Sequence, residues 1–195
     1  MERAQDHREV RQDRQEMRDD RRDLEELKRV LTRFDSAWAS RSDWEMAEVE
    51  GTLRRLLRAE LAESRVELAS DMSESRRSQR EVRGSQWEAR DDAGWRRRNK
   101  DDRRDLRDDR RDARDDRNDV RAEAASLRTR KAIAQELAQL EGRRVGGALH
   151  RKRDLIVELI RVAEREVQQG HQELREDRRE QHEDRRERRE DRRRG

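Results

Sequence analysis

The sequence predicts an all-α protein in which tandem helical hairpins form an antiparallel four-helix bundle or coiled coil with long charged helical stems. Apolar residues recur at helical spacing over long stretches. Proline, the strongest helix breaker, is absent. Charged residues make up 52% of the chain. Such a composition could indicate a disordered chain. The periodic apolar residues, the long spans without helix breakers and the absence of Gly/Ser/Pro tracts argue against disorder.

The clearest charge pattern lies between Lys100 and Ala122, where one apolar residue recurs at every seventh position. On a helical wheel of about 100° per residue, arginines occupy one flank of this apolar seam and aspartates occupy the other. The seam consists of Leu106, Ala113, Val120 and then Leu127. We call the flanking pattern the helix-association stripe, and its central residues are Arg107, Arg110, Arg111, Asp108, Asp109 and Asp112.

The first predicted helix begins with the same kind of stripe, from Arg3 to Leu24, under the seam Val10, Met17 and Leu24. Beyond Leu24 the apolar positions become denser and predict a core segment. Its residues are Leu24, Leu27, Leu31, Phe34 and Trp38.

A second helix is expected to start near Ser42, because the residues from Ser42 to Glu45 read as a capping box. Its apolar face is wide at first and then thins into another charged stem. The face consists of Leu53, Leu56, Leu57, Leu61, Val66 and Leu68. Gly94 predicts a turn at the end of this stem, and the alternative is one continuous helical rod through Gly94.

The second half of the chain repeats the order of stem, core, turn, core and stem. A third core segment should end at Gly142 and the pair Gly146 and Gly147; it contains Leu127, Ile133, Ala134, Leu137 and Leu140. A fourth contains Leu155, Ile156, Leu159, Ile160, Val162, Ala163 and Val167, and a striped stem follows from Leu174. This order predicts a tandem duplication of a helical hairpin, over 1–94 and 95–195, with one joint core.

The stripes predict association between helices. Within one helix they place like charges three and four residues apart, which costs about a few tenths of a kcal/mol per pair. Parallel neighbours would bring arginine flanks to acidic flanks, whereas antiparallel neighbours would oppose like charges. We therefore expect parallel partners: the first helix with the third, the second with the fourth, or equivalent helices of two chains. Asp109 and its equivalents beside the seam are the weak point of this prediction, and a merely solvated charged face is the alternative.

The two predicted turns carry opposite charge. Arg128–Arg153 contains eight basic and two acidic residues, and Phe34–Gly51 contains one basic and five acidic residues. A basic, glycine-flanked turn is suited to bind a polyanion. The candidate polyanion site consists of Arg143, Arg144, Arg151, Lys152 and Arg153. Head-to-head recognition between the two turns and scattered surface charge are the alternatives.

The remaining patterns exclude several classes of function. Cysteine is absent and no phosphate-binding loop or catalytic set is visible, so no enzyme, cofactor or small-molecule substrate is predicted. His7, His171 and His182 occupy arginine positions of the stripe, so no metal site is predicted. Trp38 and Trp44 should pack across the first turn, whereas Trp87 and Trp95 would mark a partner surface.

The sequence therefore predicts a non-enzymatic scaffold or interaction protein that associates with itself or with another helical protein. The alternative is a polyanion-binding or nucleic-acid-binding protein acting through the basic turn, although the stems have nearly balanced charge and should bind nucleic acid weakly. No secretion signal or membrane span is recognisable. A soluble, cytoplasmic protein is expected unless a leader precedes this chain.

Overall fold

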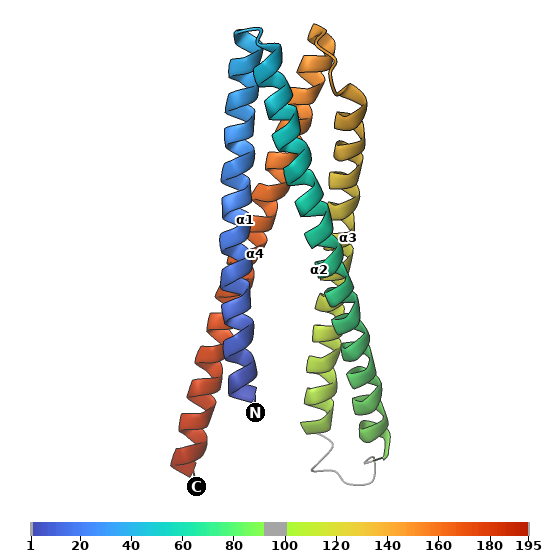
Figure 1. Cartoon of the computed structure of the whole chain (residues 1–195). Helices are drawn as coiled ribbons and strands as arrows, with labels where there is room; N and C mark the ends of the chain where they lie inside the picture. The colour runs from blue at the N-terminus through green and yellow to red at the C-terminus, as the bar shows by residue number, and fades with distance from the viewer. Residues whose placement is uncertain (1, 92–100, 195) are drawn as a thin grey trace. The chain divides into compact units, whose positions relative to one another are not determined.

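The computed structural model describes residues 2–91 and 101–194, and the predicted all-α helical-bundle fold is confirmed. The chain forms helices α1 (Glu2–Ala39), α2 (Asp43–Asp91), α3 (Asp101–Leu140) and α4 (Gly146–Arg194) (Figure 1). Within the two described ranges there is no β-strand. None of the helices, over the residues described, is long and apolar enough to cross a membrane.

These helices are divided between two compact units whose boundaries lie inside α2 and α3. The first unit comprises Met1–Arg54 and Leu137–Gly195, and the second comprises Arg55–Glu136. The sequence interpretation instead divided the chain between residues 94 and 95. The tandem duplication inferred from that division stays a prediction.

In the first unit, α1 packs against α4 with opposite direction (Figure 1). Trp38 near the end of α1 contacts His150 near the start of α4, with 4.6 Å between ring centroids. Lys28, which precedes Trp38 on α1, has its Nζ atom 3.9 Å from a carboxylate oxygen of Glu164, which follows His150 on α4. The expectation of a parallel pair of first and third helices is therefore wrong. Burial of the apolar faces of α1 and α4, not the pairing of their charges, sets this arrangement.

The apolar core of the first unit comes from three helices. Each contributes residues at the three- and four-residue spacing of a helix face, so burial removes a continuous apolar surface from water. The buried residues are Leu24, Leu27, Val30, Phe34 and Ala37 of α1; Met46, Val49 and Leu53 of α2; and Ala148, Leu149, Leu155, Ile156, Leu159, Ile160, Val162, Ala163 and Leu174 of α4. Most of the predicted core positions around the two turns are thus buried, whereas Leu31 and Trp38 are only half-buried. The prediction that Val66 of α2 belongs to an apolar core face is wrong, because its side chain is 71% exposed.

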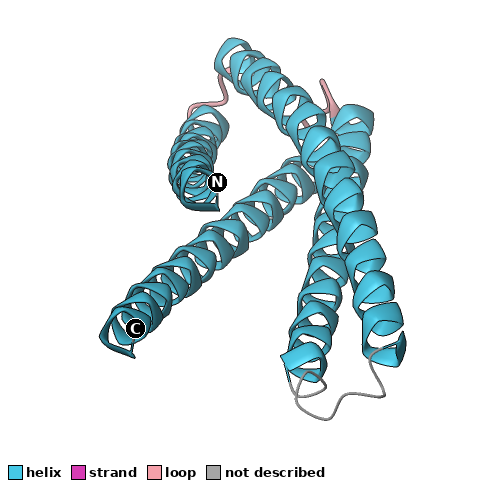
Figure 2. Cartoon of the chain, turned by 90° about the horizontal axis from the view of Figure 1, so that it is seen from below, coloured by secondary structure: helices cyan, strands magenta, loops and turns pink. Residues whose placement is uncertain are grey.

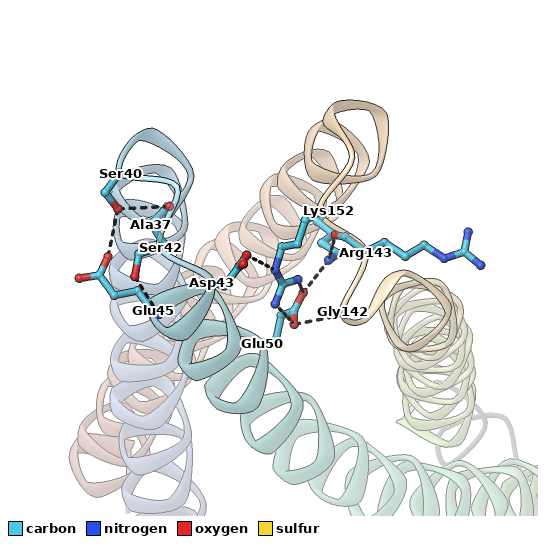
Figure 3. A network of polar contacts seen from close by, with 10 residues as sticks. Ala37, Ser40, Ser42, Asp43, Glu45, Glu50, Gly142, Arg143 and Lys152 are labelled. Atoms are coloured by element: carbon cyan, nitrogen blue, oxygen red, sulfur yellow. Dashed lines mark hydrogen bonds and ion pairs between the residues drawn. The ribbon is translucent and has the colours of Figure 1, made fainter.

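The turn between α1 and α2 is closed by local hydrogen bonds. Ser42 caps α2, because its hydroxyl oxygen accepts a hydrogen bond from the Glu45 backbone N–H at 3.3 Å. The second half of the predicted capping box is wrong. The Ser42 N–H donates to the Ala37 carbonyl at 3.1 Å, and the Glu45 carboxylate instead accepts from the Ser40 hydroxyl at 3.2 Å (Figure 3).

The turn between α3 and α4 depends on one glycine. Gly142 adopts a φ of +73°, a left-handed conformation that glycine adopts without steric cost. The prediction that Gly146 and Gly147 also end this segment is wrong, because α4 begins at Gly146. The first helical hydrogen bond runs from the Leu149 N–H to the Val145 carbonyl at 3.0 Å. The glycines therefore lie in a first turn whose N–H groups have no partner within the helix.

In the second unit, α2 and α3 lie side by side as an antiparallel hairpin (Figures 1 and 2). Arg130 near the end of α3 bonds to Ser64, in the first half of α2, and Asp109 near the start of α3 bonds to Ser85, further along α2. The alternative of one continuous rod is therefore wrong, although Gly94 itself lies outside the described residues. The expected pairing of the second stem with the fourth is also wrong, since the stem of α2 pairs with α3. Parallel pairing between equivalent helices of two chains stays a prediction.

The core of the first unit yields a direct test. Ile156 has no exposed surface, so the variant I156A should lower the free energy of unfolding by about 2–5 kcal/mol through lost apolar burial and an unfilled cavity. The control V145A alters a side chain that is 70% exposed and should change the free energy by less than about 0.5 kcal/mol. Urea unfolding followed by circular dichroism measures both. Equal effects of the two substitutions would contradict the assigned core.

Candidate association surface

The acidic and basic turns of the chain meet inside the first unit, around Glu50 (Figure 3). The Glu50 carboxylate accepts hydrogen bonds from Arg144 Nη1 at 2.7 Å and Nη2 at 3.1 Å. It also accepts one from Lys152 Nζ at 2.5 Å. Lys152 is only 2% exposed and donates a further hydrogen bond to the Arg143 carbonyl at 2.7 Å. The cluster joins the start of α2 to the start of α4 and to the turn before it.

The other cations of the candidate polyanion site also have acidic neighbours in the chain, with one exception. Arg153 binds Asp35 through two hydrogen bonds of 2.8 and 3.1 Å, and Arg151 lies 3.2 Å from Glu158. The exception is Arg143, whose side chain is exposed and points away from the cluster (Figure 3). Most of these cations therefore already form ion pairs with carboxylates of the first unit.

The ionisation of Glu50 follows from its neighbours. Burial alone would raise the pKa of this carboxyl group. Hydrogen bonds from Arg144 and Lys152, together with their positive charges, outweigh burial and lower the pKa below its ordinary value of 4.5. Glu50 is thus ionised at neutral pH, and its negative charge balances the positive charge of the buried Lys152.

The seam between α2 and α3 in the second unit is polar. Arg130 of α3 is 8% exposed. It donates to the Ser64 hydroxyl at 2.7 Å and lies 3.1 Å from the Glu60 carboxylate. Ser64 and Ser75 of α2 are themselves buried. Because Arg130 finds these partners at one alignment of the two helices, the buried contacts define the register of the hairpin.

Apolar burial in the second unit is small by comparison. Among the residues that the structure describes there, the buried apolar side chains are Leu57, Ala113 and Ile133. Hydrophobic stabilisation scales with the apolar area removed from water. The α2/α3 hairpin therefore gains much less from apolar burial than the first unit does.

A groove of about 470 Å³ runs between α2 and α3 in the second unit. Two of its lining residues, Val82 and Ala113, are apolar, and the others are arginines and glutamines. We call it the arginine groove, and it is lined by Gln79, Val82, Arg83, Gln86, Arg110, Ala113, Arg114 and Arg117. Arg117 donates through Nε to the Ala113 carbonyl at 2.7 Å. Within the described part of the chain, Arg83, Arg110 and Arg114 have no ion-pair partner.

The antiparallel pairing of α2 and α3 explains why cations gather in this groove. An antiparallel pair brings corresponding flanks of its two helices together, and Arg110, Arg114 and Arg117 of the α3 arginine flank line the groove together with Arg83 of α2. The other polar residues that α2 contributes to the groove, Gln79 and Gln86, are uncharged. The groove therefore concentrates positive charge that the hairpin itself does not neutralise.

The opposite flank of α3 concentrates negative charge. Each of its aspartates lies two residues from a groove arginine, or about 200° around the helix. We call this surface the acidic flank, and its exposed residues are Asp108, Asp112 and Asp115. Partial burial and repulsion from Asp109, Asp116, Asp108 and Asp115 raise the pKa of Asp112.

The predicted stripe thus separates into these two surfaces. Arg110 lines the arginine groove, whereas Arg107 and Arg111 are exposed outside it. Asp108 and Asp112 belong to the acidic flank. Asp109 instead turns into the seam and accepts a hydrogen bond from the Ser85 hydroxyl. The sequence prediction did not include the seam serines, of which Ser64 bonds to Arg130 and Ser85 to Asp109 across the hairpin.

The tryptophans differ from the prediction at one position. Trp38 packs edge-on against Phe34 and His150. Trp44 is 74% exposed, so its expected packing across the first turn is wrong. Trp87 is 71% exposed on α2, in the same unit as the arginine groove. Trp95 lies outside the described residues.

Of the histidines that occupy arginine positions of the stripe, His171 of α4 contacts Arg21 of α1. The side chains of His7 and His182 lie outside the described set.

Substitution of Glu50 tests the turn cluster. The variant E50Q leaves Lys152 buried without its carboxylate and should lower the free energy of unfolding by about 3 kcal/mol at pH 7. Because the pKa of Glu50 is lowered in the folded state, its stabilising contribution is present above pH 4.5 and is lost as the pH falls through the lowered pKa. The difference between wild type and E50Q should therefore shrink in acid, as measured by urea unfolding at several pH values.

The control for E50Q is E158Q, which removes the carboxylate of the Arg151–Glu158 pair. Both of these side chains are about 40% exposed, at 42 and 43%, so the expected loss is about 0–1 kcal/mol. A double variant E50Q/K152M should recover most of the loss, because it removes the buried charge as well. Similar losses in E50Q and E158Q would show that the Glu50 cluster contributes no more than a surface pair.

Neutralisation of the acidic flank should stabilise the hairpin. Asp112→Asn removes the repulsion between residue 112 and the neighbouring aspartates, and each like-charge pair costs about 0.2–0.5 kcal/mol. The unfolding temperature at neutral pH and low protein concentration should therefore rise. Ionised Asp112 is unfavourable above its raised pKa, and this effect disappears as the pH falls through that value. Wild type and variant should then unfold alike in acid. A lower unfolding temperature for the variant at neutral pH would contradict the repulsion.

Comparison with other proteins gives no further guide to function. The sequence matches no protein-family model, and neither the curated proteins nor the solved structures yield a significant match.

Proposed function

We propose that the protein is a non-enzymatic scaffold or interaction protein that associates with other copies of itself through the charged faces of its helices. The observation that carries the proposal is the separation of charge on the α2/α3 hairpin. The arginine groove and the acidic flank each gather one sign of charge, and neither is neutralised by its own hairpin partner. The arginine groove of one copy is therefore complementary in charge to the acidic flank of another copy.

The weak seam of the hairpin supports the same proposal. Arg130, Ser64 and Ser75 occupy positions where a self-sufficient pair of helices would place apolar side chains. Further association would bury more of the surface of α2 and α3. Exposed Trp87 supplies an apolar and aromatic contact of the type enriched at protein interfaces.

The alternative of polyanion binding at the basic turn has less support. Arg144, Lys152 and Arg153 would have to leave Glu50 or Asp35 before they could bind a phosphate. Lys152 would in addition have to leave a site where it is almost completely buried. A coiled-coil description of the assembled helices belongs to the same proposal, since it depends on how the copies pack.

Light scattering after size exclusion tests self-association. Exposed charges interact strongly at about 0.02 M salt and weakly at about 1 M, where the screening length is about 3 Å. We therefore expect a mass above the 23.7 kDa of one chain at low salt and a return toward 23.7 kDa at high salt. A mass of one chain at every salt concentration would refute the proposal.

A further inference from the structure

The arginine groove has the properties of a docking site for carboxylates. Arg83, Arg110 and Arg114 line a space of about 470 Å³ that the apolar residues Val82 and Ala113 also line. A guanidinium group binds a carboxylate through two parallel hydrogen bonds, and such pairs are stronger where apolar atoms exclude water. The groove therefore favours a row of carboxylate side chains over a single neutral ligand.

The spacing of the groove indicates a helix as the source of these carboxylates. Arg110 and Arg114 stand four residues apart on α3, which corresponds to about one helical turn. Asp108 and Asp112 of the acidic flank also stand four residues apart, and Asp115 follows three residues later. Carboxylates on such a helix recur at the same interval as the arginines that would receive them.

We propose that the arginine groove of one copy receives the acidic flank of a second copy, namely its Asp108, Asp112 and Asp115. This inference rests on the proposed self-association and names the surfaces that carry it. The charges are complementary in sign and spacing. Docking would also bring cations next to Asp112, whose pKa in the single chain is raised by partial burial and by repulsion from the neighbouring aspartates.

The arrangement has a consequence for the form of the assembly. The groove and the acidic flank lie on different sides of the same hairpin, so a copy that docks through its flank still presents an unoccupied groove. Such a contact joins two different surfaces and adds copies in sequence unless the series closes into a ring. The assembly should therefore grow beyond a dimer as protein concentration rises.

Two charge-removing variants test the docking. The groove variant R83Q/R110Q/R114Q keeps the acidic flank, and the flank variant D108N/D112N/D115N keeps the groove. At low salt each variant alone should have the mass of one chain by light scattering, while wild type forms larger species. An equimolar mixture should form a 1:1 dimer that does not grow, because each variant retains one of the two surfaces.

The matched control is R58Q/R65Q/R128Q, which removes three exposed arginines of the same hairpin that line neither the groove nor the acidic flank. This control should assemble like wild type, and circular dichroism should give the same helix content for all variants. If the control loses assembly to the same extent as the groove variant, total charge and not the groove drives association, and the inference is overturned.

The remaining outcomes separate this inference from the proposed function. Assembly of the groove variant like wild type would overturn the docking site but leave self-association intact. Two monomeric variants that fail to form a dimer when mixed would overturn the acidic flank as the occupant. A wild-type protein that stays monomeric at low salt would refute both proposals, and binding of a labelled DNA oligonucleotide that the groove variant loses would assign the groove to polyanions instead.

Discussion

The antiparallel direction of α2 and α3 is the constraint on which the surface chemistry of this protein depends. Each helix carries one positive and one negative flank, and the direction of pairing decides which flanks meet. Parallel helices would neutralise one another along their length. Antiparallel helices leave like charges together, so Arg83 of α2 lines one groove with Arg110, Arg114 and Arg117 of α3. Asp108, Asp112 and Asp115 of α3 are exposed outside this groove. The charge pattern is therefore not satisfied within the hairpin.

The two units have different sources of stability. The first unit buries a continuous apolar core from α1, α2 and α4, and it also contains the buried cluster of Glu50, Arg144 and Lys152. A buried ion pair adds little net stability over apolar packing, but one lost partner leaves an uncompensated charge, so such pairs favour one particular arrangement. The second unit replaces most of its apolar core with Arg130 and buried serines. The register of α2 against α3 is thus well defined, although apolar burial stabilises this unit only slightly.

Much of the fold follows from the sequence, because apolar periodicity and turn residues act locally. The predicted core residues Leu24, Leu27 and Phe34 and those from Leu155 to Ala163 are buried, and Ser42 caps the second helix as predicted. The choice of helix partners was not predictable from charge, because exposed ion pairs contribute only about 0–1 kcal/mol each and yield to apolar burial. The sequence prediction placed Asp109 beside the seam as its weak point. It did not foresee a polar seam, because that depends on which α2 residues, such as Ser85, lie opposite.

The burial of Lys152 gives this protein an internal chemical reporter. The chain has lysines at positions 28, 100, 131 and 152. The side chain of Lys28 is 43% exposed, and Lys131 is also exposed. A reagent that acylates neutral amines can reach Lys28 and Lys131 in the folded chain, whereas the Lys152 ammonium is held between Glu50 and a backbone carbonyl. Acylation at Lys152 therefore requires the junction of α2 and α4 to separate, and its rate measures how often that separation occurs.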